Sequence, residues 1–167
     1  MASGEDAERA ARAGANSLLL RMPGCTGRRV EIEAGMLRSA FDLPLLISDR
    51  VDVALAVGAD GVNLPEAGLP PGAARRLLGR AVIGRSVHSL AGAKEAEQEG
   101  ADFLLFGPVR ASVSHPGAPA QGLDRLGTIA RAVSIPVVAI GGLDLDSVSA
   151  CVAQGARGLA AIGAFQQ

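Results

Sequence analysis

The stretch LPLLISDRVDVALAVGADGVNLP at 43–65 holds one full unit of the pattern that decides the fold. Its apolar run LLIS at 45–48 predicts a short strand, and the amphipathic residues at about 50–57 predict a helix. The glycine in VGADG suits the end of that helix, because glycine readily adopts the left-handed conformation that follows a last helical turn. A second run, GVNL at 61–64, predicts a strand parallel to the first and reached by a right-handed crossover.

The same alternation continues along the chain. Small-residue helix endings like VGADG recur as AGAN at 13–16, EGADF at 99–103 and QGARG at 154–158, as expected of repeated βα units. A doubly wound open sheet is the alternative, although the GxGxxG loop typical of that fold does not occur here. Helices are expected at about 5–13, 30–40, 50–57, 72–78, 89–98, 123–133 and 145–154, and strands at Ser17–Arg21, Leu45–Ser48, Gly61–Leu64, Ala81–Ser86, Phe103–Gly107, Pro136–Gly141 and Gly158–Ile162.

These units predict an α/β protein, a TIM (β/α)8-type parallel barrel formed as a single domain over 1–167. Seven strands and seven helices can be counted, whereas a complete barrel has eight of each. The chain starts in a predicted helix and stops just after a predicted strand. We therefore expect a barrel that lacks the first strand and the last helix, with about seven βα units. Exposed strand edges in such a sheet predict a homo-oligomer, a dimer.

The composition excludes several classes of protein. Lys and Arg number 16 against 17 Asp and Glu, so there is no basic excess to bind a nucleic acid. No apolar run approaches the roughly 20 residues that cross a bilayer, and no signal peptide opens the chain. A cytoplasmic protein is therefore expected. Cys25 and Cys151 lie far apart without a CxxC spacing, which predicts reduced thiols and no metal site.

Polar and charged side chains collect just after the predicted strands. In parallel barrels the chemistry is built at the carboxyl ends of the strands, and this pattern therefore predicts an enzyme. The candidate substrate-binding residues at these ends are Arg21, Ser48, Asp49, Asn63, Ser86 and Gly107. Ser112 and Ser114 join them from the loop at 110–122, which could close over a substrate or be only a solvated loop.

Asp49 follows the run LLIS, and three roles are open to it. It could hold Mg²⁺, cap the helix that begins at about Val51, or pair with Arg50 or Arg21. Capping is the commonest role of an aspartate at such a position. A metal would need a second carboxylate nearby, and Glu66 is the only one in the next strand–loop segment. No metal site is predicted.

Glycines after the last two predicted strands favour a phosphate site. Gly141 and Gly142 follow PVVAI, and Gly163 follows GLAAI, with Ile162 beside it. Backbone N–H groups in such loops can hold a phosphate, because glycine lets the anion approach the chain closely. The alternative is that these glycines only form tight turns.

His88 is the predicted catalytic residue. It lies two residues after Ser86, so the alternation of a strand puts both side chains on the same face. An imidazole titrates near neutrality and can both remove and return a proton. The alternative is a histidine that only caps the helix that follows.

Several motifs resemble the family of thiamine-phosphate synthases and their TenI-type relatives, the thiazole tautomerases. They are LPLLISDRVDVALAVGADGVNLP, IGRSVHSL, GADFLLFGPV, SIPVVAIGG and the closing AIGAF. Together they cover roughly three-quarters of the chain in the family's order. The resemblance implies a small phosphorylated thiazole as substrate.

The synthase branch joins a pyrimidine diphosphate to a thiazole phosphate with the help of Mg²⁺. That branch would place a Gln-x-Arg-x-Lys run on the strand written here as SLLLRMP, where only Arg21 matches and Leu19 and Pro23 replace Gln and Lys. Its Gln-Glu-Asp stretch would put an aspartate at Gly68. The Lys of its mobile loop corresponds to His115.

The tautomerase branch requires one phosphate site and one histidine, which the run IGRSVHS supplies. We therefore expect a TenI-like thiazole tautomerase, an isomerase in which His88 moves a proton on the dihydrothiazole carboxylate phosphate. Arg21 would bind the substrate carboxylate, and no cofactor is expected. Two alternatives remain: a thiamine-phosphate synthase that uses Mg²⁺, and a non-catalytic protein that binds a phosphometabolite.

Overall fold

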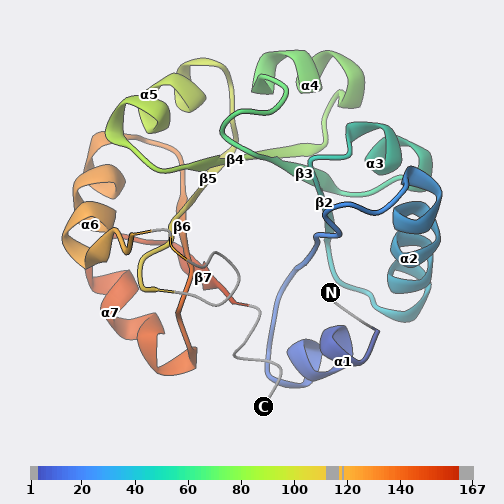
Figure 1. The fold of residues 1–167 in the computed structure, drawn as a ribbon, viewed down its shortest axis with the longest axis horizontal. Helices are drawn as coiled ribbons and strands as arrows, with labels where there is room; N and C mark the ends of the chain where they lie inside the picture. Colours follow the sequence, from blue (N-terminus) through green and yellow to red (C-terminus); the bar gives the residue numbers. More distant parts are fainter. Residues whose placement is uncertain (1–3, 112–116, 118, 162–167) are drawn as a thin grey trace.

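The seven predicted strands form one parallel sheet that curls into a half-barrel (Figure 1). The computed structural model describes residues 4–111, 117 and 119–161. Strands pair in chain order from β1 to β7, and β1 and β7 do not pair with each other in this described part. The strands are β1 (Leu18–Leu20), β2 (Leu45–Ser48), β3 (Gly61–Leu64), β4 (Val82–Val87), β5 (Phe103–Phe106), β6 (Val137–Ile140) and β7 (Gly158–Ala160).

Helices cover the outer face of this sheet, as Figure 1 shows. Each joins one strand to the next, apart from α1, which precedes β1. The prediction of a parallel β/α barrel with about seven units is therefore confirmed. The helices are α1 (Gly4–Arg12), α2 (Gly27–Ala40), α3 (Val51–Val57), α4 (Pro71–Leu78), α5 (Leu90–Gln98), α6 (Gly122–Ala132) and α7 (Val148–Ala153), the last preceded by the 3-10 turn η1 (Leu145–Ser147).

Two helix starts differ from the sequence prediction because side chains cap them. α2 begins three residues early, at Gly27, since the Thr26 side chain accepts a hydrogen bond from the Arg29 backbone N–H. The predicted helix at 145–154 begins as η1, where Asp144 and Ser147 bond each other's backbone N–H groups. Such reciprocal capping favours a tight first turn.

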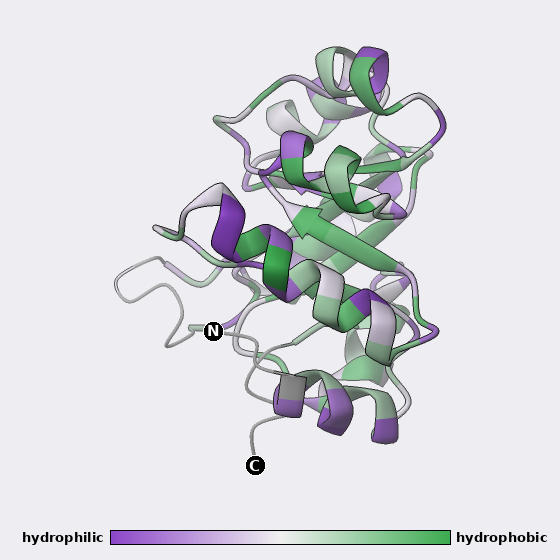
Figure 2. Cartoon of the chain, turned by 90° about the vertical axis from the view of Figure 1, so that its right-hand side faces the viewer, coloured by the Kyte–Doolittle hydropathy of each residue, from purple (hydrophilic) through white to green (hydrophobic). Residues whose placement is uncertain are grey.

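The hydrophobic core lies between the sheet and its outer helices. Alternate strand residues point outward into it, such as Ile47, Val62, Ile83 and Leu104, all at 0% exposure. Figure 2 shows apolar colour along the strands and mixed colour on the helices, as expected of helices with one buried face. The other strand residues, including Asn63 and Ser86, point to the concave face. The face toward the helices thus holds most of the apolar core, and the concave face presents polar side chains beside apolar ones such as Leu105.

Aspartates at the amino ends of strands join neighbouring βα units. Asp60, just before β3, accepts a hydrogen bond from the Leu45 N–H at 2.8 Å and pairs with Arg38 at 2.9 Å. Asp102, just before β5, repeats this arrangement with the Ile83 N–H and Arg75. The Leu45 N–H and then Arg38 hold the pKa of Asp60 below its ordinary value.

Asp60→Ala should lower the stability of the fold, because it removes one hydrogen bond from the start of β2 and one from Arg38 on α2. We expect a loss of about 1 kcal/mol, or about 2–4 °C in Tm. Because folding lowers the pKa of Asp60, its charged carboxylate stabilises the fold at pH values above 3.8, the pKa in the unfolded chain. This stabilisation is lost as the pH falls through the lower pKa of the folded state. The difference in Tm between the wild type and the variant should therefore be constant near neutrality and shrink below about pH 4. Circular dichroism melts test this, with the exposed Asp42→Ala as control; an undiminished difference at pH 3 would contradict it.

Within the described residues, no helix has the length and apolar character of a membrane-spanning segment. The predicted dimer remains a prediction.

Candidate active site

Asn63 and Ser86 form the centre of the candidate site on the concave face. They lie on the neighbouring strands β3 and β4, and the Asn63 Nδ2 donates a hydrogen bond to the Ser86 Oγ at 2.9 Å. Asn63 is only 3% exposed, and its buried Oδ1 has no hydrogen-bond partner among the described residues. An unpaired buried amide oxygen costs roughly 1–3 kcal/mol. A core position would not retain that cost, whereas a substrate-binding position can.

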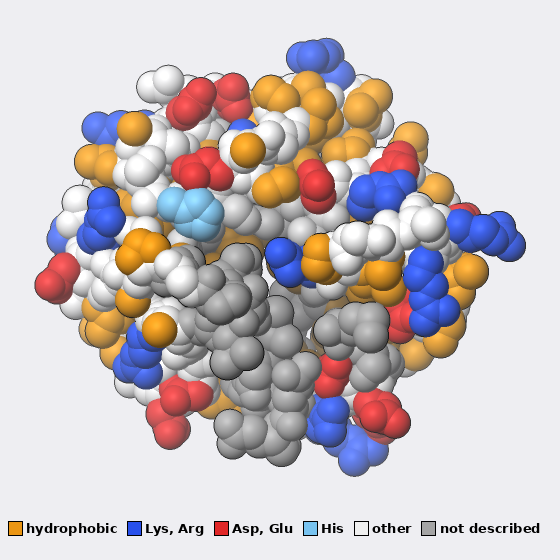
Figure 3. All heavy atoms as spheres, viewed as in Figure 1, with side chains coloured by type: hydrophobic (Ala, Val, Ile, Leu, Met, Phe, Trp, Pro, Cys, Tyr) orange, Lys and Arg blue, Asp and Glu red, His pale blue; other side chains and the backbone are white. Residues whose placement is uncertain are grey.

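His88 lies just beyond β4, with its imidazole fixed at one nitrogen. Its Nδ1 lies 2.5 Å from the carbonyl oxygen of Gly107, at the end of β5. Because a carbonyl can only accept, the hydrogen must be on Nδ1, and Nε2 is left as the nitrogen that can exchange a proton. Figure 3 shows this face, where the described histidine lies at the surface beside acidic side chains. The geometry suits an acid or base at the mouth of the half-barrel.

Asp49 lies at the rim in an unusual backbone conformation. Its φ of 65° makes it the one residue other than glycine with a positive φ among those described. The Asp49 N–H donates to the Asn63 carbonyl at 3.0 Å, which ties the end of β2 to β3. Such strained residues concentrate at functional sites. Ser48 is half-buried beside it and Arg21 is exposed after β1, so both lie at the same strand ends.

Arg50 does not join the site, because its guanidinium bonds Asp52 through two atoms. Its Nε lies 2.8 Å from Oδ1 and its Nη2 lies 2.5 Å from Oδ2. This hydrogen bonding lowers the pKa of Asp52 to about 2 and raises the pKa of Arg50. Pairing with Arg50, one of the roles open to Asp49, is therefore not what the structure has, because Arg50 at the N-terminus of α3 pairs with Asp52.

Gly141 and Gly142, the predicted phosphate-binding residues, form a tight loop after β6. Both have positive φ, 95° and 63°. A side chain on Gly142 would meet the Ala111 carbonyl oxygen at 2.3 Å, and one on Gly141 would meet Pro108 at 2.6 Å. Only glycine fits against the segment after β5. Ser112, Ser114, Ile162 and Gly163 lie outside the described residues.

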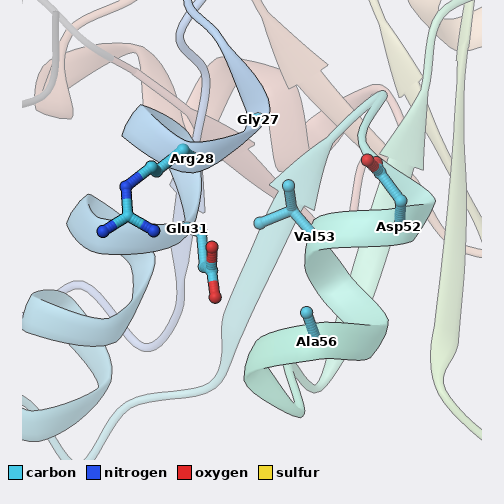
Figure 4. Close-up of a pocket in the computed structure, with 6 residues that line it drawn as sticks. All are labelled: Gly27, Arg28, Glu31, Asp52, Val53 and Ala56. Carbon is cyan, nitrogen blue, oxygen red and sulfur yellow. The ribbon is translucent and has the colours of Figure 1, made fainter.

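A pocket of about 260 Å³ lies elsewhere, between α2 and α3 (Figure 4). Its lining includes Arg28, Glu31 and Asp52, none of which comes from the concave face. The strand ends are the candidate active site, because the bonded pair of Asn63 and Ser86 and the tethered histidine lie there. Two residues beside that site escaped sequence reasoning: Glu66, considered only as a metal ligand, and Arg85, which gave no signal.

Comparison with known proteins assigns the family. The family model described as thiamine monophosphate synthase matches residues 2–165. The chain belongs to this family. It is similar to the putative thiamine-phosphate synthase 2 of Aquifex aeolicus, with 43% identity over 133 residues, 80% of this chain and 72% of the relative. The thiamine-phosphate synthase of Chloroflexus aurantiacus is 46% identical over 123 residues, 73% of this chain and 57% of the relative.

A solved structure supports the same assignment. The thiamine phosphate pyrophosphorylase from Pyrococcus furiosus superposes with a TM-score of 0.85 at 37% identity, over 95% of this chain and 77% of that one. The prediction of a TenI-like tautomerase, an isomerase, is therefore wrong: these relatives carry synthase names, which denote a transferase. The run IGRSVHS is too short to distinguish the two branches, whereas the similarity to these relatives extends along most of the chain.

The Mg²⁺ that synthases of this family use does not fit the residues that this chain presents. Asp49 offers one carboxylate at the rim, but Gly68 has no side chain, and the Glu66 Oε1 accepts the His88 N–H. A side chain at Gly68 would meet the Pro65 ring at 2.9 Å, so a carboxylate at 68 does not fit beside this proline. The described residues contain no group of three or more side chains arranged to hold a metal ion.

Asn63→Leu should separate stability from function. Leucine has nearly the shape of asparagine and removes the unpaired buried oxygen, so Tm should stay the same or rise. Turnover should fall by about tenfold or more, because the orientation of Ser86 is lost. Thermal melts and steady-state kinetics measure the two effects. A large drop in Tm with unchanged turnover would show that Asn63 is structural, and Ser39→Ala, whose hydroxyl bonds the Gly35 carbonyl on α2, is the control.

Mg²⁺ should bind the substrate-free protein only after the loop is changed. Titration calorimetry on the wild type should show no saturable Mg²⁺ binding at millimolar concentrations, since one carboxylate is too few. The double variant Pro65→Gly/Gly68→Asp removes the ring and adds the second carboxylate, so it should gain measurable binding. Gly68→Asp alone should gain less. Saturable binding by the wild type would contradict this account.

Proposed function

We propose that this chain joins a pyrimidine diphosphate to a thiazole phosphate, the transferase reaction for which its relatives are named. The observation that carries the proposal is similarity of 37–46% identity to proteins named thiamine-phosphate synthase, along most of this chain. The polar groups at the strand ends support it. The chain covers only part of these relatives, so the reaction is assigned as a proposal.

In the proposed complex, different strand ends receive the two substrates. The thiazole phosphate would bind the backbone N–H groups of the Gly141–Gly142 loop, with Ile162 and Gly163 after β7 as further partners. Ser86, fixed by Asn63, would donate its hydroxyl hydrogen to a substrate atom on the concave face. Gly107, Ser48 and Asp49 would line the same face, and Ser112 and Ser114 would contribute from the 110–122 loop.

The reaction exchanges one bond for another. The carbon–oxygen bond between the pyrimidine methylene group and the diphosphate breaks, and the diphosphate leaves with the electron pair. The thiazole nitrogen supplies the pair for the new carbon–nitrogen bond, so no oxidant or reductant is needed. His88, protonated at Nε2, and Arg21 would donate hydrogen bonds to the departing diphosphate and offset its charge.

Purified protein given both substrates should form thiamine phosphate and release diphosphate at equal rates. His88→Gln should lower kcat by about 10²-fold, the usual contribution of a positioned acid. Chromatography of the product and a coupled diphosphate assay follow the two products, with Mg²⁺ added and omitted. Glu97→Ala, remote from the strand ends, is the matched control and should keep wild-type kcat.

Absence of product with both substrates present would overturn the synthase proposal. Thiazole phosphate that binds without turnover would then favour the third possibility, a protein that only binds a phosphometabolite. The observation that favours such a binding protein is that Leu19, Pro23 and Gly68 replace the Gln, Lys and Asp of the synthase branch.

A further inference from the structure

The loop at 65–69, between β3 and α4, is fastened by one arginine. Arg85 lies on β4 next to Ser86. Ser86 points to the concave face of the sheet, so the Arg85 side chain points to the other face. Its Nη2 donates to the Glu66 carbonyl at 2.7 Å, and its Nη1 donates to the carbonyls of Leu69 at 2.8 Å and Gly68 at 3.4 Å. Three carbonyls of one short loop therefore share a single guanidinium, whose planar set of donors suits this arrangement.

The fastened loop points the Glu66 carboxylate at the backbone of His88. The Glu66 Oε1 accepts the His88 N–H at 3.1 Å. It also lies over the first turn of α5, where a side chain on Gly92 would come within 2.5 Å of it. The first turn of a helix favours a negative charge. Glycine at 92 thus leaves the space that this carboxylate occupies.

His88 is consequently held at two points from two different elements. Glu66 holds the backbone N–H from the β3–α4 loop, and the Gly107 carbonyl holds Nδ1 from the end of β5. With both tethers in place, Nε2 is the only polar atom of the ring left to meet a substrate.

We propose that Glu66 is a positioning residue and that the Arg85-fastened loop serves to orient His88. In this chain the loop does not present a metal-binding carboxylate at Gly68, and its one carboxylate is directed to the protein. Pro65, Gly68, Arg85 and Gly92 are the four features that make this arrangement possible. The effect on turnover rests on the proposed synthase function, but the effect on the imidazole does not.

The test combines ¹⁵N NMR of the histidine rings with kinetics. At alkaline pH the neutral wild-type ring should show hydrogen on Nδ1, and the signal missing from His88→Gln assigns it. Glu66→Ala should shift the His88 ring signals toward a mixture of tautomers and lower kcat about tenfold, with KM within about twofold. Glu66→Gln keeps an acceptor oxygen and should restore most of both.

Two further variants separate positioning from simple loss of stability. Glu97→Ala removes another carboxylate that accepts a backbone N–H, that of Ser134, so it can lower Tm but should leave the His88 signals unchanged. Arg85→Lys keeps the charge but loses the shared donation to three carbonyls, and it should shift the signals in the same direction as Glu66→Ala. If Glu66→Ala does not fold, the His88 ring signals of Arg85→Lys test the positioning role instead.

Unchanged His88 ring signals in Glu66→Ala, or in Arg85→Lys where Glu66→Ala does not fold, would overturn the positioning role. If the wild type forms no thiamine phosphate, the synthase proposal fails, while the ring signals still decide the inference about Glu66. Shifted signals with wild-type kcat and KM would overturn the part that concerns turnover.

Discussion

The parallel direction of all seven strands is the constraint on which the rest of this structure depends. Parallel neighbours need a crossover, and here a helix makes each one and returns along the outer face of the sheet. All strand carboxyl ends consequently lie at one rim. Residues distant in sequence, such as Asp49, His88 and Gly142, lie at this rim because each follows the carboxyl end of a strand.

β4 shows how one strand serves packing and chemistry together. Ile83 belongs to the buried cluster under α1–α4, whereas Val87 belongs to the cluster under α5–α7. Between them, Arg85 and Ser86 point to opposite faces, one to fasten the β3–α4 loop and the other to bond Asn63. A one-residue shift in the register of this strand would exchange the two and destroy both arrangements.

The site combines features that cost stability with features that fix geometry. Asn63 keeps an amide oxygen to which no described residue donates a hydrogen bond, and Asp49 holds a left-handed backbone. Around them, the tethers on His88 and the pairing of Arg50 with Asp52 fix the neighbouring groups. A rim of fixed geometry that keeps one unsatisfied polar group suits a substrate-binding surface.

The sequence alone determined the fold and the rim. Alternating apolar runs and glycine-terminated helices specify βα units, because burial on one face and helix termination are local properties. The polar residues that follow the predicted strands then indicated His88, Asn63 and Ser86 as site residues. The sequence did not determine the branch of the family, since a motif as short as IGRSVHS does not report the reaction. Only the tertiary structure decided what holds His88. Glu66 lies 22 residues away in sequence, and Arg85 acts through the loop that carries Glu66, so their contacts exist only once β3 and β4 pair.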